Sequence, residues 1–139
     1  VHNVLRGAGL RDEIKIGAAG KIVTAYDIAR ALALGADWCN SARGFMFAIG
    51  CIQAQACHTG KCPVGIATQN PELTKRLDPD EAAERVANFL NSMTMEMALL
   101  TRSLGKSDVH SLEPEDLAAL TIEASAMARV PLVGTNKVY

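Results

Sequence analysis

The first third of the chain contains short apolar runs separated by a longer amphipathic segment. A β-branched run, Ile14-Lys15-Ile16, predicts a strand that ends at the small residues of the loop 17–20. From Thr24 onward, apolar residues recur at helical spacing, and Thr24 with Asp27 three places later predicts a capping box. Gly35 is expected to end this helix, because glycine commonly follows a helix C-terminus.

A second strand and a second short helix are predicted directly afterwards. Residues 36–40 are long enough only for a strand, Ser41 stands at the position of a helix N-cap, and residues 43–50 continue as a short helix. The order strand, helix, strand, helix implies two parallel strands joined by a right-handed crossover. Parallel strands need cover on both faces, so we expect further strands from upstream residues, from a second copy or from another chain.

The second half of the chain is predicted to be helical. Asp78-Pro79-Asp80-Glu81 supplies an N-cap, a proline at the first helical position and a reciprocal acid at the third. Apolar residues then recur at threes and fours as far as Gly105, which predicts one long amphipathic helix. One or two further helical pieces are expected over 114–129, and the residues after Leu132 are expected to form a loose tail.

The charge balance excludes several classes of partner. The chain carries 14 basic and 15 acidic residues, well interspersed, for a net charge of -1, so nucleic acid and anionic membranes have no electrostatic attraction to it. No apolar run approaches the roughly 20 residues that span a bilayer, and the start does not resemble a secretory signal. We therefore expect a cytoplasmic protein. Because the chain begins at Val1 and strand patterns are confined to its first third, we also expect a fragment or processed subunit of a larger protein.

Three of the four cysteines lie close together in the sequence. Five residues separate Cys51 from Cys57, and four separate Cys57 from Cys62. Thiolates are soft ligands that hold iron in clusters, and three of them in one loop can bind the three irons of a cubane that lacks one corner. Zinc is an alternative, with His58 as a fourth donor, although structural zinc normally uses cysteine pairs separated by about two to four residues. Free or oxidised thiols are the remaining alternative, and disulfides are disfavoured in a reducing cytosol.

Other residues of possible chemical interest have simpler interpretations. Cys39 lies on the second predicted strand, where a lone cysteine is usually a small buried hydrophobe. His58 is interpreted as a neighbour of the cysteine loop, because Cys57 already occupies that side. His2 and His110 have no partner visible in the sequence and are assigned no function.

A second candidate site lies at the expected C-terminal ends of the two strands, where a parallel α/β barrel holds a phosphate. Small residues there leave the backbone amides accessible to an anion, and two basic side chains add charge. An ordinary turn between a strand and a helix is the alternative. The residues of the candidate phosphate site are Gly17, Ala18, Ala19, Gly20, Lys21, Ser41, Ala42 and Arg43.

The stretch GCIQAQACHTGKCPVGIATQ, residues 50–69, resembles the FMN-binding synthase domain of glutamate synthase and its stand-alone relatives. Residues 17–50 are similar to the seventh and eighth βα units of that family's barrel. The resemblance implies a (β/α)8 TIM barrel that binds FMN and a 3Fe-4S cluster. It implies that Cys51, Cys57 and Cys62 are the cluster ligands and that the candidate phosphate site approaches the flavin phosphate.

The resemblance also implies a reaction and its partners. Electrons from a ferredoxin or a pyridine-nucleotide-dependent subunit would pass through the cluster to FMN, for the reductive formation of glutamate from 2-oxoglutarate and glutamine-derived ammonia. The loop 17–20 differs from the paired-glycine signature of the long glutamate synthases and is more similar to the stand-alone group. The catalytic residues are not identified in this sequence.

A full barrel needs about 250 residues, so this α/β chain is expected to supply only the C-terminal portion of one. Residues 1–50 would form the last two βα units, 51–69 the iron-sulfur loop and 70–139 a helical segment. Alone, the chain is expected to be inactive and either to self-associate or to bind the missing barrel portion. The alternative function is a non-catalytic interaction or structural module, in which the cysteine loop holds zinc or no metal.

Overall fold

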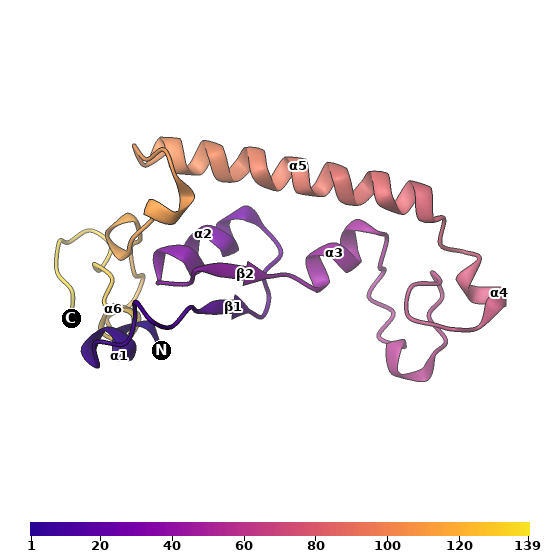
Figure 1. The fold of residues 1–139 in the computed structure, drawn as a ribbon, viewed down its shortest axis with the longest axis horizontal. Helices are drawn as coiled ribbons and strands as arrows, with labels where there is room; N and C mark the ends of the chain where they lie inside the picture. The colour runs from indigo at the N-terminus through magenta and orange to yellow at the C-terminus, as the bar shows by residue number, and fades with distance from the viewer.

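A computed structural model describes residues 1–139 and shows an elongated α/β arrangement with a two-stranded parallel sheet (Figure 1). The first half contains α1 (His2–Gly7), β1 (Gly17–Ala19), α2 (Ala25–Ala33), β2 (Trp38–Asn40) and α3 (Arg43–Ala48). The second half contains the 3-10 turn η1 (Cys57–Thr59), α4 (Pro71–Thr74), α5 (Pro79–Ser103), the 3-10 turns η2 (Val109–Ser111) and η3 (Pro114–Asp116), and α6 (Ile122–Ala128). None of these helices combines the length and the apolar character needed to cross a membrane.

The predicted parallel pairing of the two strands is confirmed, with Ala18 opposite Cys39 at the centre of the register. The first strand, however, was predicted at 14–16 and lies at Gly17–Ala19. The reason is a side chain from a distant residue: Asp37 Oδ2 accepts the Ile16 amide at 2.6 Å, so the regular ladder begins one residue later. Much of the small-residue segment expected as a loop is therefore a strand.

Local capping signals place the two principal helices. Thr24 and Asp27 form the predicted capping box at the start of α2, with the Thr24 amide 2.9 Å from Asp27 Oδ2. Asp78 caps α5 by accepting the amides of the second and third helical residues, which confirms the predicted start. The expected reciprocal bond from Glu81 is absent, because its carboxylate pairs with Arg85 one turn along the helix.

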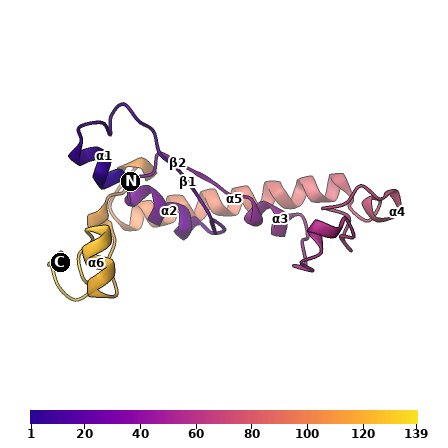
Figure 2. The same ribbon diagram turned by 90° about the horizontal axis from the view of Figure 1, so that it is seen from below.

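The small core lies where α5 crosses α2. Figures 1 and 2 show α5 running along the length of the molecule, and α2 contacts both α5 and β2. Ala29, Ala33 and Leu112 form the buried cluster, so the segment after α5 also covers α2. Farther along, the rings of Phe45 on α3 and Phe89 on α5 meet edge to face with centroids 5.5 Å apart, a favourable geometry for aromatic pairs.

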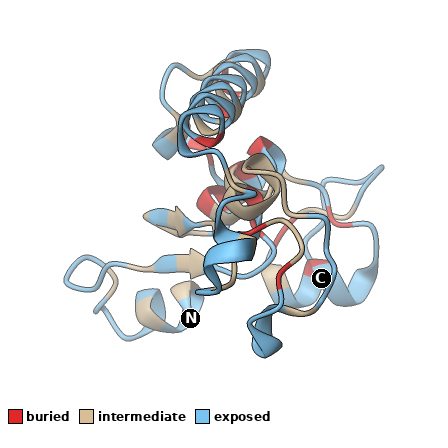
Figure 3. Cartoon of the chain, turned by 90° about the vertical axis from the view of Figure 1, so that its right-hand side faces the viewer, coloured by how far each residue is buried: buried red, intermediate tan, exposed pale blue.

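The chain exposes far more surface than a compact protein of its size. Only 15 of 139 residues are buried, and Figure 3 shows most of the ribbon as exposed or intermediate. The accessible surface is 9537 Å². A compact monomer of this mass exposes about 7,000 Å², so about 2,500 Å² is in excess. Large apolar side chains, including Trp38, Leu99 and Met127, contribute to this surface.

The residues after Leu132 were predicted to be a loose tail. They are all exposed and form no helix or strand, as predicted, but hydrogen bonds tie them to the preceding segment. Leu132 pairs with Ala119 in an isolated parallel bridge. The final residue is also fixed, because the Tyr139 amide donates to the Oγ of Ser125 at 3.2 Å. Ser125 is fully buried, so this hydroxyl anchors the end of the chain against α6. The expected helical pieces between 114 and 129 are present as η3 and α6.

Candidate functional site

The three clustered cysteines lie in the loop that joins α3 to α4, at the far end of the molecule from both termini (Figure 1). The turn η1 carries Cys57, and Gly60 and Gly65 adopt left-handed backbone conformations on either side of Cys62, with φ of 68° and 80°. Glycine adopts this region without steric cost. The two glycines therefore reverse the chain around its third cysteine, as their positions in the sequence predicted.

The three cysteines of this loop line one cavity of only about 10 Å³. Cys51, Cys57 and Cys62 all line it, and Pro63 and Val64 are among the other lining residues. Each of the three is a free cysteine, with Cys62 buried, Cys51 half-buried and Cys57 exposed. The structure thus brings together all three residues predicted as cluster ligands.

The spacing of these side chains bears on the kind of metal centre they can hold. No three histidine, cysteine, aspartate or glutamate side chains of the chain gather closely enough to bind one metal ion. Zinc needs such a gathering, because its bonds to sulfur are about 2.3 Å long. A cluster instead binds each thiolate through a different iron atom, which places the sulfurs farther apart. His58 is exposed and does not line the cavity.

The environment of Cys62 favours its thiolate form. Backbone N–H groups of the following turn, that of Ala67 most strongly, lower the pKa of the Cys62 thiol, and burial acts in the opposite direction. These N–H groups belong to Ala67, Val64, Ile66 and Gly65, in decreasing order of their effect on the pKa. Because the thiolate is the form that binds metals, a sulfur surrounded by amide donors is suited to act as a ligand.

Two glutamines in the same loop have strained backbones. Gln53 and Gln55 both lie in the left-handed region, with φ of 57° and 55°. This conformation costs a residue with a side chain about 1 kcal/mol, and such outliers cluster at functional sites. Nothing in the local sequence signals it, since glutamine is not a residue that favours positive φ.

Two arginines contact the ends of the cysteine loop, and sequence reasoning did not identify them. Arg76, between α4 and α5, donates from Nη1 to the carbonyl of Pro63 at 3.0 Å, directly after the third cysteine. Arg85 of α5 approaches the other end, where a Cβ added to Gly50 would lie 3.0 Å from its Nη1. The loop is thus bracketed by guanidinium groups at the residues that precede Cys51 and follow Cys62.

The candidate phosphate site is only partly assembled as predicted. A cavity of about 400 Å³ is lined by Ala19, Gly20, Lys21, Ile22, Asn40, Ser41, Ala42 and Arg43. Six of these are predicted residues, among them the two basic ones, Lys21 and Arg43. Gly17 and Ala18 belong to β1 and do not line the cavity. The small size of Gly17 has another cause, because a Cβ there would lie 2.7 Å from the indole of Trp38.

Ser41 does not cap α3, contrary to the prediction. Its hydroxyl donates instead to the carbonyl of Ile22 at 2.5 Å, and Ala42 stands at the N-cap position without a side-chain bond. This bond ties the segment after β2 to the segment after β1, which holds the two sides of the cavity together. Lys21 adopts a left-handed conformation, with φ of 57°, where the chain turns away from β1.

Cys39 lies outside the cavity of the other thiols, on β2. Burial raises the pKa of its thiol, so the side chain stays protonated. A protonated thiol is neither a good nucleophile nor a metal ligand. This agrees with its interpretation as a small apolar residue.

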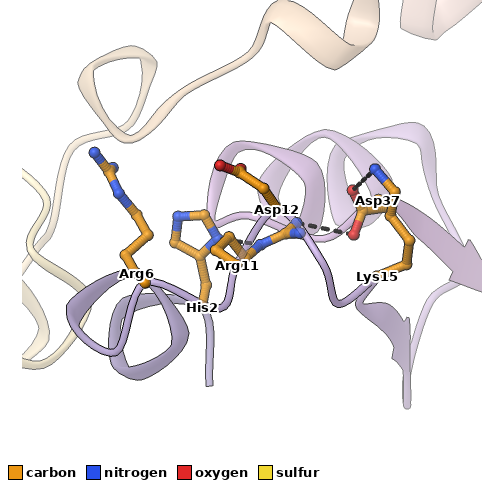
Figure 4. A pocket seen from close by; sticks show the side chains of 7 residues that line it. His2, Arg6, Arg11, Asp12, Lys15 and Asp37 are labelled. Carbon is orange, nitrogen blue, oxygen red and sulfur yellow. Dashed lines mark hydrogen bonds and ion pairs between the residues drawn. The ribbon is translucent and has the colours of Figure 1, made fainter.

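A polar cavity of about 710 Å³ lies at the other end of the sheet (Figure 4). Arg11 is its central residue: it donates to His2 Nδ1 at 3.0 Å, to the Gly35 carbonyl at 2.9 Å and to Asp37 Oδ2 at 2.8 Å. Lys15 reaches the second oxygen of the same carboxylate at 3.7 Å. Through these contacts, Arg11 holds α1 and the segment before β1 against the turn between α2 and β2.

Parallel strands, a cavity at their ends and a cysteine loop are thus the features to compare with known proteins. A family model described as "Conserved region in glutamate synthase" matches residues 1–107. This chain belongs to the glutamate synthase family. A "Glutamate synthase large subunit-like protein" of Rhizobium meliloti is 43% identical over 148 residues, covering 95% of this chain and 34% of the relative.

Shorter alignments with other members of the glutamate synthase family lead to the same conclusion. "Glutamate synthase large subunit-like protein YerD" of Bacillus subtilis is 46% identical over 111 residues, which cover 79% of this chain and 21% of the relative. An "Archaeal glutamate synthase [NADPH]" of Methanocaldococcus jannaschii is 46% identical over 112 residues, covering 81% and 22%. The chain therefore spans between about a fifth and a third of these glutamate synthase relatives.

Both candidate sites lie inside the part of the chain that matches the glutamate synthase family. The family match ends at residue 107, so η2, η3 and α6 lie beyond it. The alignment with the Rhizobium relative nevertheless covers 95% of the chain, so it extends into this C-terminal segment. The segment that completes the core over α2 is thus shared with at least one glutamate synthase-like protein.

Proposed function

We propose that this chain is the C-terminal part of the FMN-binding barrel of a glutamate synthase-like oxidoreductase and that it holds a 3Fe-4S cluster. Its two βα units would be the last two of a (β/α)8 barrel. The parallel pairing of β1 and β2 with α2 between them supports this, as does the excess of about 2,500 Å² of exposed surface. The other barrel strands, in residues outside this chain, would cover that surface.

The observation that carries the proposal is the shared cavity of three thiols. Cys51, Cys57 and Cys62 would each bind one iron of the cluster. The amide donors around Cys62 would stabilise its thiolate and disperse the negative charge of the bound group. The cluster and FMN supply one-electron and two-electron chemistry, and the chain's own residues bind, orient and shield them.

The cavity at the ends of β1 and β2 would take the FMN phosphate. Gly20 offers a backbone amide without a side chain in the way, while Lys21 and Arg43 supply positive charge. The helix α3 has only six residues, so these two charges contribute more than its dipole. The bond from Ser41 to Ile22 would keep the phosphate cavity at a fixed width.

The reaction we propose is the reductive formation of glutamate from 2-oxoglutarate and glutamine-derived ammonia. Electrons would come from NADPH through a pyridine-nucleotide-dependent subunit, or from a ferredoxin. The name of the archaeal relative, which specifies NADPH, supports the first of these two donors. Both the donor and the remaining barrel would lie outside the chain.

The cluster assignment is tested by comparing two cysteine substitutions in the full-length protein. Cys57→Ser should abolish cluster assembly, because a hydroxyl is a poor ligand for iron in a cluster. Cys39→Ser is the matched control, since Cys39 lies on β2 away from the cavity, and it should keep the full cluster. Iron, sulfide and zinc are measured after anaerobic purification, together with the paramagnetic signal of the oxidised protein.

The metal content of these proteins distinguishes an iron-sulfur oxidoreductase from a structural module. Equal iron and sulfide in Cys57→Ser and the wild-type protein would overturn the ligand assignment. A colourless wild-type protein with stoichiometric zinc would favour the alternative, a structural module with a zinc-bound loop.

A further inference from the structure

One guanidinium near the cysteine cavity has no carboxylate partner. Arg76 donates to the carbonyl of Pro63 at 3.0 Å, and Pro63 itself lines the cavity of the three thiols. This contact joins residues 13 positions apart and fixes the side chain at the exit of the loop. A carbonyl oxygen leaves the positive charge of arginine uncompensated.

The other cations near the loop differ from Arg76 in this respect. Lys75 pairs with Glu72, and Arg85 pairs with Glu81, so each of these charges is opposed by a carboxylate one turn away. Lys61 precedes the third cysteine, but no hydrogen bond or ion pair holds its side chain in one place, whereas Arg76 is held by its bond to Pro63. Arg76 is therefore the one cation held at a fixed place beside the cavity without a neutralising partner.

A fixed positive charge has a defined effect on a redox centre. One-electron reduction adds a negative charge to the group in the cavity, and a nearby cation stabilises the reduced form more than the oxidised form. Net charge and hydrogen bonding around the ligands are among the factors that set the potentials of iron-sulfur clusters. The contact to Pro63 acts on the same turn whose amides donate to Cys62.

We propose that Arg76 is a positioning residue of the cluster site, which fixes the turn after Cys62 and raises the reduction potential of the cluster. This inference rests on the proposed function, because it requires a cluster in the cavity. The positive charge of Arg76 shifts the equilibrium toward the reduced cluster, and its hydrogen bond keeps that charge close to the third ligand.

The test is a redox titration of the full-length protein, followed by the paramagnetic signal of the oxidised cluster. Arg76→Gln removes the charge, and Arg76→Lys keeps it. Arg102→Gln is the matched control, because it removes an equal charge from the last turn of α5, about 35 Å along the helix from its start. We expect Arg76→Gln to lower the ratio of reduced to oxidised cluster roughly fivefold, about 40 mV for a one-electron couple.

The other variants should retain the wild-type potential, and the shift in Arg76→Gln should shrink in about 1 M salt because the side chain is exposed. A potential in Arg76→Gln equal to that of Arg102→Gln would overturn the inference. If Arg76→Gln does not assemble a cluster, Arg76→Lys decides: a wild-type potential supports the inference, and loss of the cluster in both variants refutes a role for the charge. A wild-type protein without any cluster signal would refute the proposed function itself, which separates the two failures.

Discussion

Replacing Gly65 with alanine should disrupt the cysteine loop far more than the same substitution at Gly60. Both glycines have positive φ, 80° and 68°, so alanine at either position bears the cost of a left-handed backbone, about 1 kcal/mol. Their surroundings differ. A Cβ at Gly60 has nothing within 4 Å, whereas one at Gly65 lies 2.5 Å from the Leu73 carbonyl oxygen and 3.1 Å from the Leu77 amide nitrogen.

The magnitude follows from the atoms that would be overlapped. Both neighbours of the added Cβ at Gly65 are backbone atoms of α4 and the turn after it, so no side-chain rotation relieves the contact. Overpacking of this kind costs about 2 kcal/mol, which brings the total for Gly65→Ala to about 3 kcal/mol. Gly60→Ala should cost only about 1 kcal/mol.

Amide hydrogen exchange of the full-length protein measures this difference directly. The free energy of opening should fall by about 3 kcal/mol for amides of residues 65–77 in Gly65→Ala and by about 1 kcal/mol in Gly60→Ala. Iron content should fall in Gly65→Ala, because the displaced turn no longer presents its amides to Cys62. Equal losses of protection in the two variants would contradict the steric clash expected between a Cβ at residue 65 and the backbone of Leu73 and Leu77.

Three further outcomes can be checked by thermal or chemical unfolding. Asp78→Ala should destabilise α5 by about 1 kcal/mol and Asp78→Ser by much less, because serine also accepts N-terminal amides. Lys106→Met should lower the free energy of unfolding at neutral pH, because it leaves the half-buried Asp116 without its cation, and the loss should shrink in the double variant Lys106→Met/Asp116→Asn. Burial, followed by the charge of Arg11, lowers the pKa of His2 below its ordinary value of 6.5, so the neutral ring is favoured in the folded state. Its stabilising contribution should be complete above pH 6.5 and decline as the pH falls below that value, a decline that is absent in His2→Phe.

The features that could be predicted from the sequence are those set by near neighbours. Thr24 and Asp27 lie three residues apart, and their capping box requires only the first turn of α2. Asp78 caps α5 in the same way, and Gly105 ends it with φ of 74°. The cysteine spacing predicted three ligands in one loop, and these three residues do line a common cavity.

The features that were missed depend on residues distant in sequence. The start of β1 is shifted because Asp37, 21 positions away, takes the Ile16 amide. Arg76 reaches Pro63 across 13 positions, and neither residue carries a local signal of that contact. The C-terminal tail is ordered by the buried hydroxyl of Ser125, which periodicity does not identify as a partner of the last residue. Six of the eight residues that line the candidate phosphate cavity were predicted, but Gly17 does not line it and is small because the indole of Trp38 lies against it.

The 25-residue helix α5 has a mechanical consequence for the whole chain. Its length is about 37 Å, so a tilt of about 5° at one end moves the other by about 3 Å. Arg85, near its start, approaches the beginning of the cysteine loop at Gly50, while its later turns pack on α2 and η2. Because α5 contacts both regions, a small tilt of this helix at the cysteine loop would displace its far end, next to α2 and η2, by several times as much.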